Sequence, residues 1–490
     1  MTDTAEHFTK SSKAVSLISI GSRRMPLAHL PLHISERKIL LGLSDVSMLN
    51  VALALVLRLR MGAPFSWRIV LVRPQWFILL TLLWLLFGPA FDAYSLRTSR
   101  LPGSILCIVK PALLTLFTYL LIPYVTPYLL PSRLTTGMFV VLSLGLLSLS
   151  RALYALILAQ PPFQRRALIV GAGRAGRTIV QAIRKNACTE YQLIGYIDDD
   201  PAKQGESIEG LPVLGTSRDL IPLTRASNVS EVILAITHLH KISPNLLQAI
   251  LDCQRSGFRI TFMPDLYEQI TGKLPVEHIG YNLQALLPSE GSSTARLYAG
   301  LKRSMDIAIS LVGLVILGLL LPFIALAIRF DSPGPIFYAQ WRVGKGGKTF
   351  RLFKLRTMIL GAEREGEAVW TEREDSRVTR VGRILRATHI DELPQFINVL
   401  KGEMSIVGPR PERPEFVAKL EKLIPFYQLR HSVRPGMAGW GLVNQGYGSS
   451  FEDALIKLEY DLYYIKHQSI YFDLLILLRT LEEMLLFRGR

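Results

Sequence analysis

Runs of apolar residues divide the chain into three parts. The first part holds four apolar windows, each interrupted by at most one or two ionisable residues: Leu40–Leu57, Ile69–Phe91, Ile105–Leu130 and Thr135–Leu158. Each window has about 18 to 26 residues, which at roughly 1.5 Å per residue is enough to cross the ~30 Å core of a bilayer. The pattern predicts four transmembrane helices within residues 1–160.

Three lone charges inside these windows, Asp45, Lys110 and Arg151, need a partner or a route to water. We expect them to pair between helices or to reach the interface, rather than to line a transport pathway. Basic residues before the first window favour a cytosolic start, although Arg58, Arg60 and Arg68 between the first two windows and Arg73 at the start of the second oppose it. The large polar domains that follow favour the cytosolic side for both ends of the helical region.

Short apolar runs alternate with helical stretches from Arg166 onward. Strands are expected at Ala167–Val170, Gln192–Ile197, Glu231–Ile236 and Arg259–Met263. Strands that alternate with helices are typical of a parallel sheet covered by helices on both faces. We therefore predict a Rossmann-like, doubly wound α/β domain over residues 161–297.

Gly171, Gly173 and Gly176 form the pattern G-x-G-x-x-G directly after the first expected strand and before a helix. In that setting glycines let backbone N–H groups and the helix N-terminus approach a pyrophosphate. The acidic partner expected about 20 residues later is displaced, because the run 198–200 of three aspartates begins 27 residues after Gly171. Two interpretations stay open, a possible nucleotide site and a glycine-rich turn kept for packing.

A fifth apolar stretch, Ile307–Ile328, has 22 residues without a charge and is flanked on both sides by basic residues. If it crossed the membrane, the rest of the chain would lie on the side opposite the α/β domain. Pro322 interrupts the stretch, and a proline inside a helix removes a hydrogen bond and kinks the axis. We predict a re-entrant membrane helix over residues 303–330 that bends near Pro322 and leaves on the face where it entered.

Composition and charge support a membrane protein. Of the 490 residues, 49% are hydrophobic and 19% are charged, below the roughly 25% charged of soluble domains. The net charge is +17, and residues 1–166 alone carry 17 basic and five acidic side chains. This favours anionic membrane lipids and phosphate-bearing substrates over nucleic acid, since no zinc-finger spacing or arginine-rich helix accompanies the charge. The three cysteines lack C-x-x-C spacing, which excludes a disulfide framework and a cysteine zinc site.

The segment 329–356 carries seven basic residues and one acidic residue, Asp331. Its start, Asp331–Pro335, is a rigid turn, and basic and aromatic residues then alternate as in a half-buried strand with one cationic face. The strand could bind lipid headgroups and substrate phosphates, or it could be a solvated basic strand beside the bilayer. The adjoining membrane helix favours phosphate binding.

The adjacent acids Asp391 and Glu392 follow Thr388 within four residues, which predicts that both lie in the first turn of a helix. A carboxylate pair there complements the helix dipole. That structural role accounts for the position but not for the nearby cations Arg386 and Arg410. An acid near a helix N-terminus and arginines stays ionised, and an ionised carboxylate can attack phosphorus or hold Mg²⁺.

Six segments together carry a family resemblance: Asp331–Pro335, Gln340–Gly344, Phe353–Met358, Ile390–Pro394, Ser405–Pro411 and Val433–Gly436. They lie in order within residues 298–490, and this part resembles the bacterial polyprenyl-phosphate sugar-1-phosphate transferases, or monotopic phosphoglycosyl transferases. The four-helix and α/β parts resemble the N-terminal half of the long members, the exopolysaccharide-initiating type. The resemblance therefore implies a phosphoglycosyl transferase catalytic domain over residues 298–490, of mixed α/β structure.

The implied reaction moves a sugar 1-phosphate from a UDP-sugar to undecaprenyl phosphate and releases UMP, on the cytoplasmic face of the bacterial inner membrane. The resemblance makes Asp391 the nucleophile of a covalent phosphosugar intermediate. Glu392 would assist proton handling and share an Mg²⁺ site with Asp391. A homodimer is possible, a hexose is the family-level expectation for the sugar, and the glycan pathway is open.

Basic positions matched by the family motifs complete the expected site. Arg386 and Arg410 match positions that contact substrate phosphate. Lys354 and Arg356 lie in the matching basic motif and are expected to bind phosphate as well. Such cations suit the reaction, because phosphoryl transfer depends mainly on positioning and on neutralisation of charge by Mg²⁺ and arginine.

The chain departs from the family pattern in two places. Leu321 precedes Pro322 where many relatives have serine, so the bend lacks a hydroxyl partner. Ala438 and Gly441 stand where relatives commonly carry threonine and alanine, which leaves the preferred donor open.

Two other functions stay open. A membrane-tethered NAD-dependent nucleotide-sugar dehydratase or epimerase shares the helical and glycine-rich layout, and its Tyr-x-x-x-Lys motif has one match at Tyr298–Lys302. Lys302 also suits an anchor at the membrane interface. A non-enzymatic scaffold for polysaccharide assembly is the second alternative, and it would not depend on Asp391.

Overall fold

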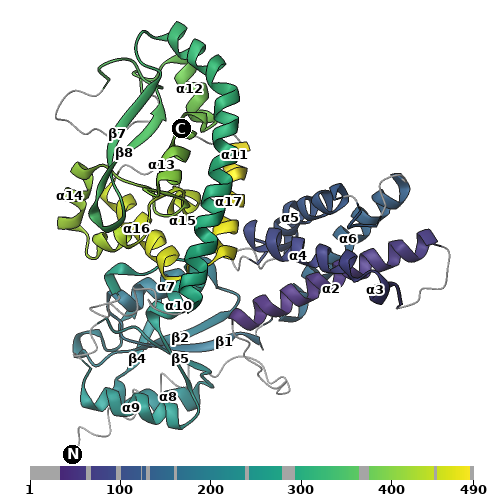
Figure 1. Cartoon of the computed structure of the whole chain (residues 1–490). Coiled ribbons are helices and arrows are strands. Elements are labelled where there is room, and N and C mark those ends of the chain that lie inside the picture. The colour runs from purple at the N-terminus through teal and green to yellow at the C-terminus, as the bar shows by residue number, and fades with distance from the viewer. Residues whose placement is uncertain are drawn as a thin grey trace, which may run out of the picture. The chain divides into compact units, whose positions relative to one another are not determined.

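The computed structural model describes residues 34–61, 68–94, 101–122, 124–127, 133–158, 160, 163–237, 242–278, 293–362, 375–445 and 450–485. Contacts divide the chain into two compact units, Met1–Thr271 and Gly272–Arg490 (Figure 1). The second unit starts ahead of the expected boundary at residue 297. The reason is that Lys273 Nζ lies 3.7 Å from a carboxylate oxygen of Glu459, and the Leu274 N–H donates to the Glu459 carbonyl.

All four apolar windows at the start of the chain form helices: α2 (Ile34–Met61), α3 with α4 (Arg68–Val72 and Pro74–Ala90), α5 (Leu101–Leu121) and α6 (Arg133–Leu153). A π-helical turn, Tyr154–Leu158, extends α6. In the part of the chain that the structure describes, Glu36–Leu59 and Arg133–Ile157 are long and apolar enough to cross a membrane, whereas Pro74–Ala90 and Ile105–Leu121 are shorter apolar helices. The helices are confirmed, and four crossings stay a prediction.

Two of the lone charges in these helices pair with each other. Arg151 on α6 donates to Asp45 on α2 over 2.6 Å, and both side chains are buried. The Ser150 hydroxyl also donates to Asp45, over 3.2 Å. Because an unpaired charge in an apolar bundle is costly, this pair favours one packing of α2 against α6. The expected interhelical pair is therefore present.

A six-stranded sheet follows in the first unit, built from β1 (Arg165–Val170), β2 (Tyr191–Ile197), β3 (Ser207–Ile208), β4 (Leu211–Gly215), β5 (Glu231–Leu234) and β6 (Arg259–Phe262). The order is β3-β4-β2-β1-β5-β6, and all neighbours are parallel except β3 and β4. The four expected strands are confirmed. The sequence pattern did not predict β3 and β4.

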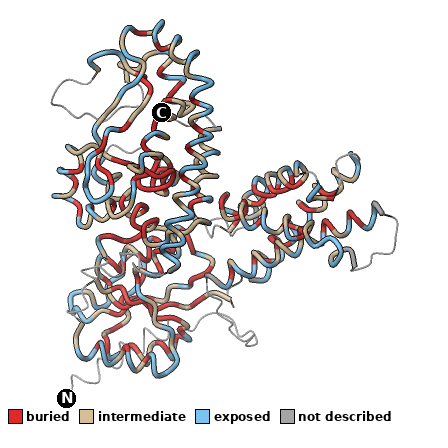
Figure 2. Tube along the Cα trace, in the orientation of Figure 1, coloured by how far each residue is buried: buried red, intermediate tan, exposed pale blue. Residues whose placement is uncertain are grey.

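Helices cover both faces of this sheet, and alternate residues of β1 point to opposite faces. Ala167 and Ile169 pack with α7 (Arg174–Asn186) and α10 (Met263–Thr271). Leu168 and Val170 pack with α8 (Leu220–Ala226) and α9 (Pro244–Arg255). Figure 2 shows buried residues along these strands. A parallel sheet buried on both faces is the architecture that the alternating pattern predicted.

The second unit opens with α11 (Ser293–Asp331), a single helix of 39 residues that contains Pro322. Its segment Thr294–Asp331 is long and apolar enough to cross a membrane. Figure 1 shows that the ribbon of α11 changes direction toward its C-terminal end. Past Pro322, Ile328 packs with Leu385 in an apolar cluster of its own. The re-entrant path through the membrane stays a prediction.

The expected basic strand is an antiparallel hairpin of β7 (Phe337–Val343) and β8 (Thr349–Leu355). The 3₁₀ turn between them, Lys345–Gly347, has two successive glycines at positive φ, 66° and 76°. Such backbone angles favour glycine and close a tight connection. The Asp331 carboxylate caps a later helix by accepting from the Val381 N–H over 2.8 Å.

Short elements complete the second unit. They are α12 (Arg380–Ala387), a 3₁₀ turn (Ile390–Glu392), α13 (Gln395–Lys401), β9 (Ser405–Val407), α14 (Pro414–Leu423), a 3₁₀ helix (Tyr427–Ser432), β10 (Gly436–Ala438), α15 (Trp440–Gln445), α16 (Phe451–Lys466) and α17 (Ile470–Leu485). Strands β9 and β10 pair in parallel beside an apolar core that includes Val407 and Ile476. The C-terminal helix α17 therefore contributes to this core.

Candidate functional site

The two adjacent carboxylates lie in a 3₁₀ turn between α12 and α13. Asp391 is 5% exposed and Glu392 8%. His389, which precedes the turn, has φ 57°. This left-handed conformation is uncommon for a residue other than glycine, and such strain is concentrated at functional sites. It reverses the chain sharply and directs the two acids into the protein.

One local expectation is wrong. Thr388 was expected to begin the helix that holds the two acids, but it ends α12, and its hydroxyl donates to the Ile384 carbonyl over 2.9 Å. The acids lie in their own 3₁₀ turn, and Pro394 occupies the N-cap of α13. A threonine hydroxyl can cap the start of a following helix or donate to a carbonyl in the preceding turn. The spacing between Thr388 and Asp391 alone did not distinguish these two roles.

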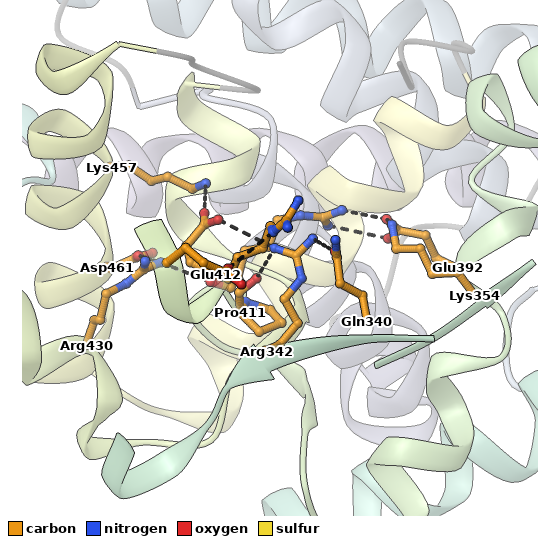
Figure 3. A network of polar contacts seen from close by, with 12 residues as sticks. Gln340, Arg342, Lys354, Glu392, Pro411, Glu412, Arg430, Lys457 and Asp461 are labelled. Atoms are coloured by element: carbon orange, nitrogen blue, oxygen red, sulfur yellow. Dashed lines mark hydrogen bonds and ion pairs between the residues drawn. The ribbon is translucent and has the colours of Figure 1, made fainter. Parts of the chain in front are cut away.

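Two cations hold Glu392. Arg410 donates to Oε1 over 2.5 Å and to Oε2 over 3.4 Å, and Lys354 Nζ donates to Oε1 over 2.7 Å (Figure 3). Asp391 is placed differently, because its nearest cation, Lys354 Nζ, is 3.9 Å away. Among the residues that the structure describes, no side chain donates a hydrogen bond to the Asp391 carboxylate. Glu392 is thus neutralised and Asp391 remains available to a ligand.

Asn398 aligns β8 with α13 and so brings Lys354 to the acids. Its amide oxygen accepts from the Phe353 N–H over 3.1 Å, and its amide nitrogen donates to the Arg351 carbonyl over 2.7 Å. The buried Asn398 side chain therefore makes two hydrogen bonds with the β8 backbone that a neighbouring strand could otherwise make. Lys354 follows Phe353 directly, and its position relative to Glu392 depends on this contact.

The long helix α11 holds α13 at two points and β9 at a third. Arg303 donates to the carbonyls of Val399 and Leu400, both over 2.7 Å, and so caps the C-terminus of α13. Asp306 accepts from the Ile406 N–H just beyond α13, over 2.9 Å. A Cβ on Gly313 would lie 2.2 Å from the Phe396 ring. The membrane helix therefore fixes the helix that follows the two acids.

Burial and charge separate the acidities of the pair. Burial raises the pKa of Asp391 to about 6, against the attraction of Lys354. Burial also opposes ionisation of Glu392, but Arg410 and Lys354 outweigh it and hold the pKa of Glu392 well below its usual range. At neutral pH both groups are carboxylates, and Asp391 is the one that exchanges its proton nearest to physiological pH.

The other two predicted cations, Arg386 and Arg356, form their hydrogen bonds with other groups and not with the two carboxylates. Arg386 Nε donates to the Thr357 hydroxyl over 2.9 Å, although its charge still lowers the pKa of Asp391. Arg356 is buried and donates to the carbonyls of Pro333, Ser332 and Ile328. Arg356 thus closes the turn after α11 instead of joining the acids. Of the four expected cations, Lys354 and Arg410 contact the pair.

The carboxylates suit a shared metal site only in part. The structure describes no group of three or more His, Cys, Asp and Glu side chains that could hold a metal ion. Mg²⁺ commonly uses one or two carboxylates and completes its shell with substrate phosphate oxygens and water. Asp391 fits that arrangement, whereas the Glu392 oxygens already accept from Arg410 and Lys354. An Mg²⁺ site remains a prediction centred on Asp391.

The site includes residues that the sequence analysis did not name as functional. A network of ion pairs lies beside the Arg410 segment (Figure 3), in which Arg430 and Asp461 are buried and Arg342, Glu412 and Lys457 are half-buried. Arg342 lies inside one of the six motif segments, which was the available signal. The other four form two pairs, Arg430 with Asp461 and Glu412 with Lys457, whose members are 31 and 45 residues apart in the sequence. No local pattern connects residues at such separations.

The glycine motif of the first unit has a packing reason at two of its three positions. A Cβ on Gly171, at φ 104°, would lie 2.7 Å from the Ala235 carbonyl oxygen, and one on Gly176 would lie 2.1 Å from the Gly171 oxygen. A Cβ on Gly173 meets nothing within 4 Å. The Asp198 carboxylate accepts from the Ala172 N–H over 2.8 Å. Packing accounts for Gly171 and Gly176, and nucleotide binding stays a prediction.

The pair that matched a dehydratase motif has a structural partner. The Tyr298 hydroxyl and Lys302 Nζ both contact Asp473 on α17, over 3.0 Å and 2.9 Å. Asp473 is fully buried, so the three groups form an ion pair with a hydrogen bond that joins α11 to α17. This contact gives both side chains a role in the fold.

Two family models match the chain. A model described as bacterial sugar transferase matches residues 297–487, and one described as CoA-binding domain matches residues 89–264. The first range contains the two carboxylates, all six motif segments and the network of Figure 3. The second range contains the parallel sheet.

Three relatives show similar matches. A UDP-N-acetylgalactosamine-undecaprenyl-phosphate N-acetylgalactosaminephosphotransferase of Aeromonas hydrophila is 42% identical over 48% of this chain and 54% of its own length. A putative undecaprenyl-phosphate N-acetylgalactosaminyl 1-phosphate transferase of Bacillus subtilis is 52% identical over 28% and 75%. A UDP-glucose:undecaprenyl-phosphate glucose-1-phosphate transferase of Escherichia coli is 32% identical over 65% and 67%.

The matched part of the chain thus spans about half of the Aeromonas relative and two thirds of the Escherichia coli relative. The match to the bacterial sugar transferase model, the motif segments and the buried carboxylate pair all fall in the second unit of the chain. The chain belongs to the bacterial polyprenyl-phosphate sugar-1-phosphate transferase family.

Proposed function

We propose that this protein transfers a sugar 1-phosphate from a UDP-sugar to undecaprenyl phosphate and releases UMP. One observation carries the proposal: of two adjacent buried carboxylates, Glu392 is neutralised by Arg410 and Lys354, while Asp391 accepts no hydrogen bond from the described side chains. A buried carboxylate with its lone pairs available is a nucleophile. The relatives, which carry such transfer in their names, support the same reaction.

The transfer has two steps at one phosphorus atom. An Asp391 oxygen attacks the phosphorus that bears the sugar, the bond to the UMP oxygen breaks, and UMP leaves with the electron pair. A phosphate oxygen of undecaprenyl phosphate then attacks the same phosphorus, and the Asp391 carboxylate leaves. Both leaving groups are anions at neutral pH, so neither step requires a general acid for the leaving group.

Charge neutralisation is the main work of the surrounding residues. Phosphoryl transfer gains its rate mostly from positioning and from cations near the non-bridging oxygens. Arg410 and Lys354, held by Glu392, would present N–H groups to the phosphates, and Arg386 would add its charge from the side of α12. The role of Glu392 is then to orient these cations, and proton handling is secondary.

A bound Mg²⁺ would supply further positive charge to the diphosphate. Asp391 would contribute a carboxylate oxygen to the metal, and the substrate would contribute phosphate oxygens. The Glu392 oxygens would reach the metal after exchanging a contact with Lys354 or Arg410.

The donor is proposed to be an N-acetylhexosamine in place of the hexose that the family resemblance suggested. The two relatives named for N-acetylgalactosamine are 42% and 52% identical to this chain in their matched parts, against 40% and 32% for the glucose transferases of Caulobacter vibrioides and Escherichia coli. Comparing UMP release from UDP-N-acetylgalactosamine and UDP-glucose tests this choice. Faster turnover of UDP-glucose would restore the hexose.

The site is proposed to act on the cytoplasmic face of the inner membrane in the initiation of exopolysaccharide or O-antigen type glycans. A re-entrant α11 would keep both units on the side that holds nucleotide sugars. The turn that Arg356 closes would then mark the point where the chain leaves the membrane.

Turnover of the purified protein tests the proposed reaction. With Mg²⁺, a UDP-sugar and undecaprenyl phosphate, we expect wild type to release UMP and Asp391→Asn to release none above background. Asp252→Asn provides a control, because Asp252 also pairs with an arginine, Arg255, but on α9 in the first unit. Equal turnover by wild type and Asp391→Asn would refute the proposal and leave the scaffold alternative.

A further inference from the structure

The segment that carries Arg410 has no regular secondary structure, yet each of its carbonyls has a donor. The Pro409 carbonyl accepts from the Gly436 N–H over 2.8 Å, and the Glu412 carbonyl accepts from the Val343 N–H over 2.9 Å. Between them, the carbonyls of Arg410 and Pro411 accept from guanidinium groups over 3.0 Å and 3.2 Å. The backbone on both sides of the Arg410 side chain is therefore fixed by other elements.

Arg430 supplies the donor to the Arg410 carbonyl. Its Nη2 atom donates both to that carbonyl and to Asp461 on α16, the latter over 2.8 Å, and its Nη1 atom donates to the Tyr427 hydroxyl over 2.6 Å. The side chains of Arg430 and Asp461 are each 3% exposed. The guanidinium plane is held by three partners, and only one of them belongs to the Arg410 segment.

Arg342 supplies the second donor. Its Nη1 atom donates to the Pro411 carbonyl and lies 3.7 Å from Glu412, and its Nη2 atom donates to Gln340 over 2.6 Å (Figure 3). Lys457 on α16 also donates to Glu412, over 2.9 Å. Two arginines from different elements therefore hold consecutive peptides of one segment.

Stability alone is a poor reason for this arrangement. A buried ion pair contributes little net free energy of folding, because desolvation offsets most of its attraction. Apolar residues of similar volume would serve a packing role as well. What the guanidinium groups provide, and apolar residues cannot, is a directed hydrogen bond to a carbonyl next to Arg410.

We propose that Arg430, oriented by Asp461, is a positioning residue that places Arg410 against Glu392 and the substrate phosphates, with Arg342 as its second support. This inference rests on the proposed function. Arg430 does not touch substrate in this account and acts through the backbone of Arg410. Loss of the Arg430 contact lets the Arg410 segment shift, and displacements of about 1 Å in such groups can cost about a hundredfold in rate.

A double-mutant cycle between Arg430 and Arg410 tests this directly. We expect Arg430→Met to lower kcat/KM for the UDP-sugar by about tenfold or more in the wild-type background, and by less than about twofold in an Arg410→Met background. The effect disappears in the second background because the residue to be positioned is already gone. Equal losses in both backgrounds would overturn the inference, since a merely structural role reduces the active fraction whatever stands at 410.

A buried ion pair elsewhere in the same unit provides the matched control. Lys302 and Asp473 contact each other over 2.9 Å, and they join α11 to α17 without touching the Arg410 segment. We expect Lys302→Met to change activity by the same factor in both backgrounds, as independent sites do. If the effects of Lys302→Met and Arg410→Met on kcat/KM were as non-additive as those of Arg430→Met and Arg410→Met, the inference would also be overturned.

A milder variant keeps the test decisive if Arg430→Met does not fold. Asp461→Asn retains the shape of the side chain and removes the charge that orients Arg430. We expect it to raise KM and lower kcat per folded molecule, with thermal unfolding recorded alongside, and to be silent in the Arg410→Met background. Activity that tracks the folded fraction alone would contradict positioning. Absence of UMP release by wild type would instead refute the proposed function.

Discussion

Two neighbouring acids differ in this protein because their surroundings differ. Glu392 lies between Arg410 and Lys354, whereas Asp391 lies farther from Lys354, with 3.9 Å between its carboxylate and the Lys354 Nζ atom. The sequence predicted the pair and both cations from motif residues. It did not predict that Arg356, two residues from Lys354, donates to backbone carbonyls. In a continuing strand the two side chains would share one face, but β8 ends at Leu355 and Arg356 lies beyond it.

The pH dependence of the reaction follows from Asp391. Its pKa is raised to about 6, and the nucleophile is the ionised form, which is present above the pKa and lost below it. We expect UMP release to be constant above about pH 7 and to fall roughly tenfold per pH unit below about pH 6. A pH–rate profile of the first half-reaction measures this. Activity that stays constant down to pH 4.5 would contradict the assignment of Asp391.

The same shift predicts how Asp391→Asn affects stability. The folded protein binds the Asp391 proton more tightly than the unfolded chain, so this group's contribution to the free energy of unfolding falls as pH rises from about 4 to about 6. At pH 7 the ionised form destabilises the fold. We therefore expect Asp391→Asn to unfold at the same temperature as wild type or a higher one. A clearly lower unfolding temperature would mean that its inactivity reports misfolding.

Substitution of Lys354 should mainly lower turnover, whereas substitution of Arg356 should mainly lower stability. Lys354→Met removes a cation from Glu392 and should lower kcat by about ten- to a hundredfold with little loss of stability. Arg356→Met leaves buried carbonyls without a donor and should lower the free energy of unfolding by about 2 kcal/mol, while the folded fraction keeps its turnover. Urea unfolding and UMP release on both variants separate the two roles. The reverse pattern would restore Arg356 as a phosphate ligand.

At the scale of elements, the sequence predicted those with strong periodicity or length. The helices of the first region, the β1, β2, β5 and β6 strands and the basic hairpin segment were all anticipated. Strands β3 and β4 were not, since β3 has two residues and Pro212 interrupts the apolar run of β4. The contact of α11 with α13 was also beyond prediction, because it depends on Gly313 and Phe396, which are far apart in sequence.

That contact gives an element-scale prediction with a control in the same helix. A side chain at Gly313 would enter the Phe396 ring, whereas a Cβ at Gly318 meets nothing within 4 Å. We expect Gly313→Leu to displace α13, to lower UMP release by about tenfold and to cost about 1 to 3 kcal/mol of stability. Gly318→Leu should match wild type in both measurements. Equal turnover by the two variants would show that α11 does not position the site.

At the scale of the whole molecule, the proposed function requires both units to lie on one side of the membrane. Cys188, an exposed free cysteine of the α/β domain, reports on the first unit. Leu423, which is exposed on the second unit, can be changed to cysteine to report on the other. We expect a membrane-impermeant maleimide to label neither position in intact cells and both in inverted vesicles. Labelling of Leu423→Cys alone in intact cells would show that α11 crosses the membrane.

The most direct test of the central claim is covalent capture of the sugar phosphate on the protein. Wild-type protein incubated with Mg²⁺ and a UDP-sugar labelled in the sugar and its phosphate, without undecaprenyl phosphate, should retain label on the peptide that contains residue 391. Added undecaprenyl phosphate should then release it. Asp391→Asn should retain none. Label that remains on Asp391→Asn, or that maps to another peptide of the wild type, would contradict the account.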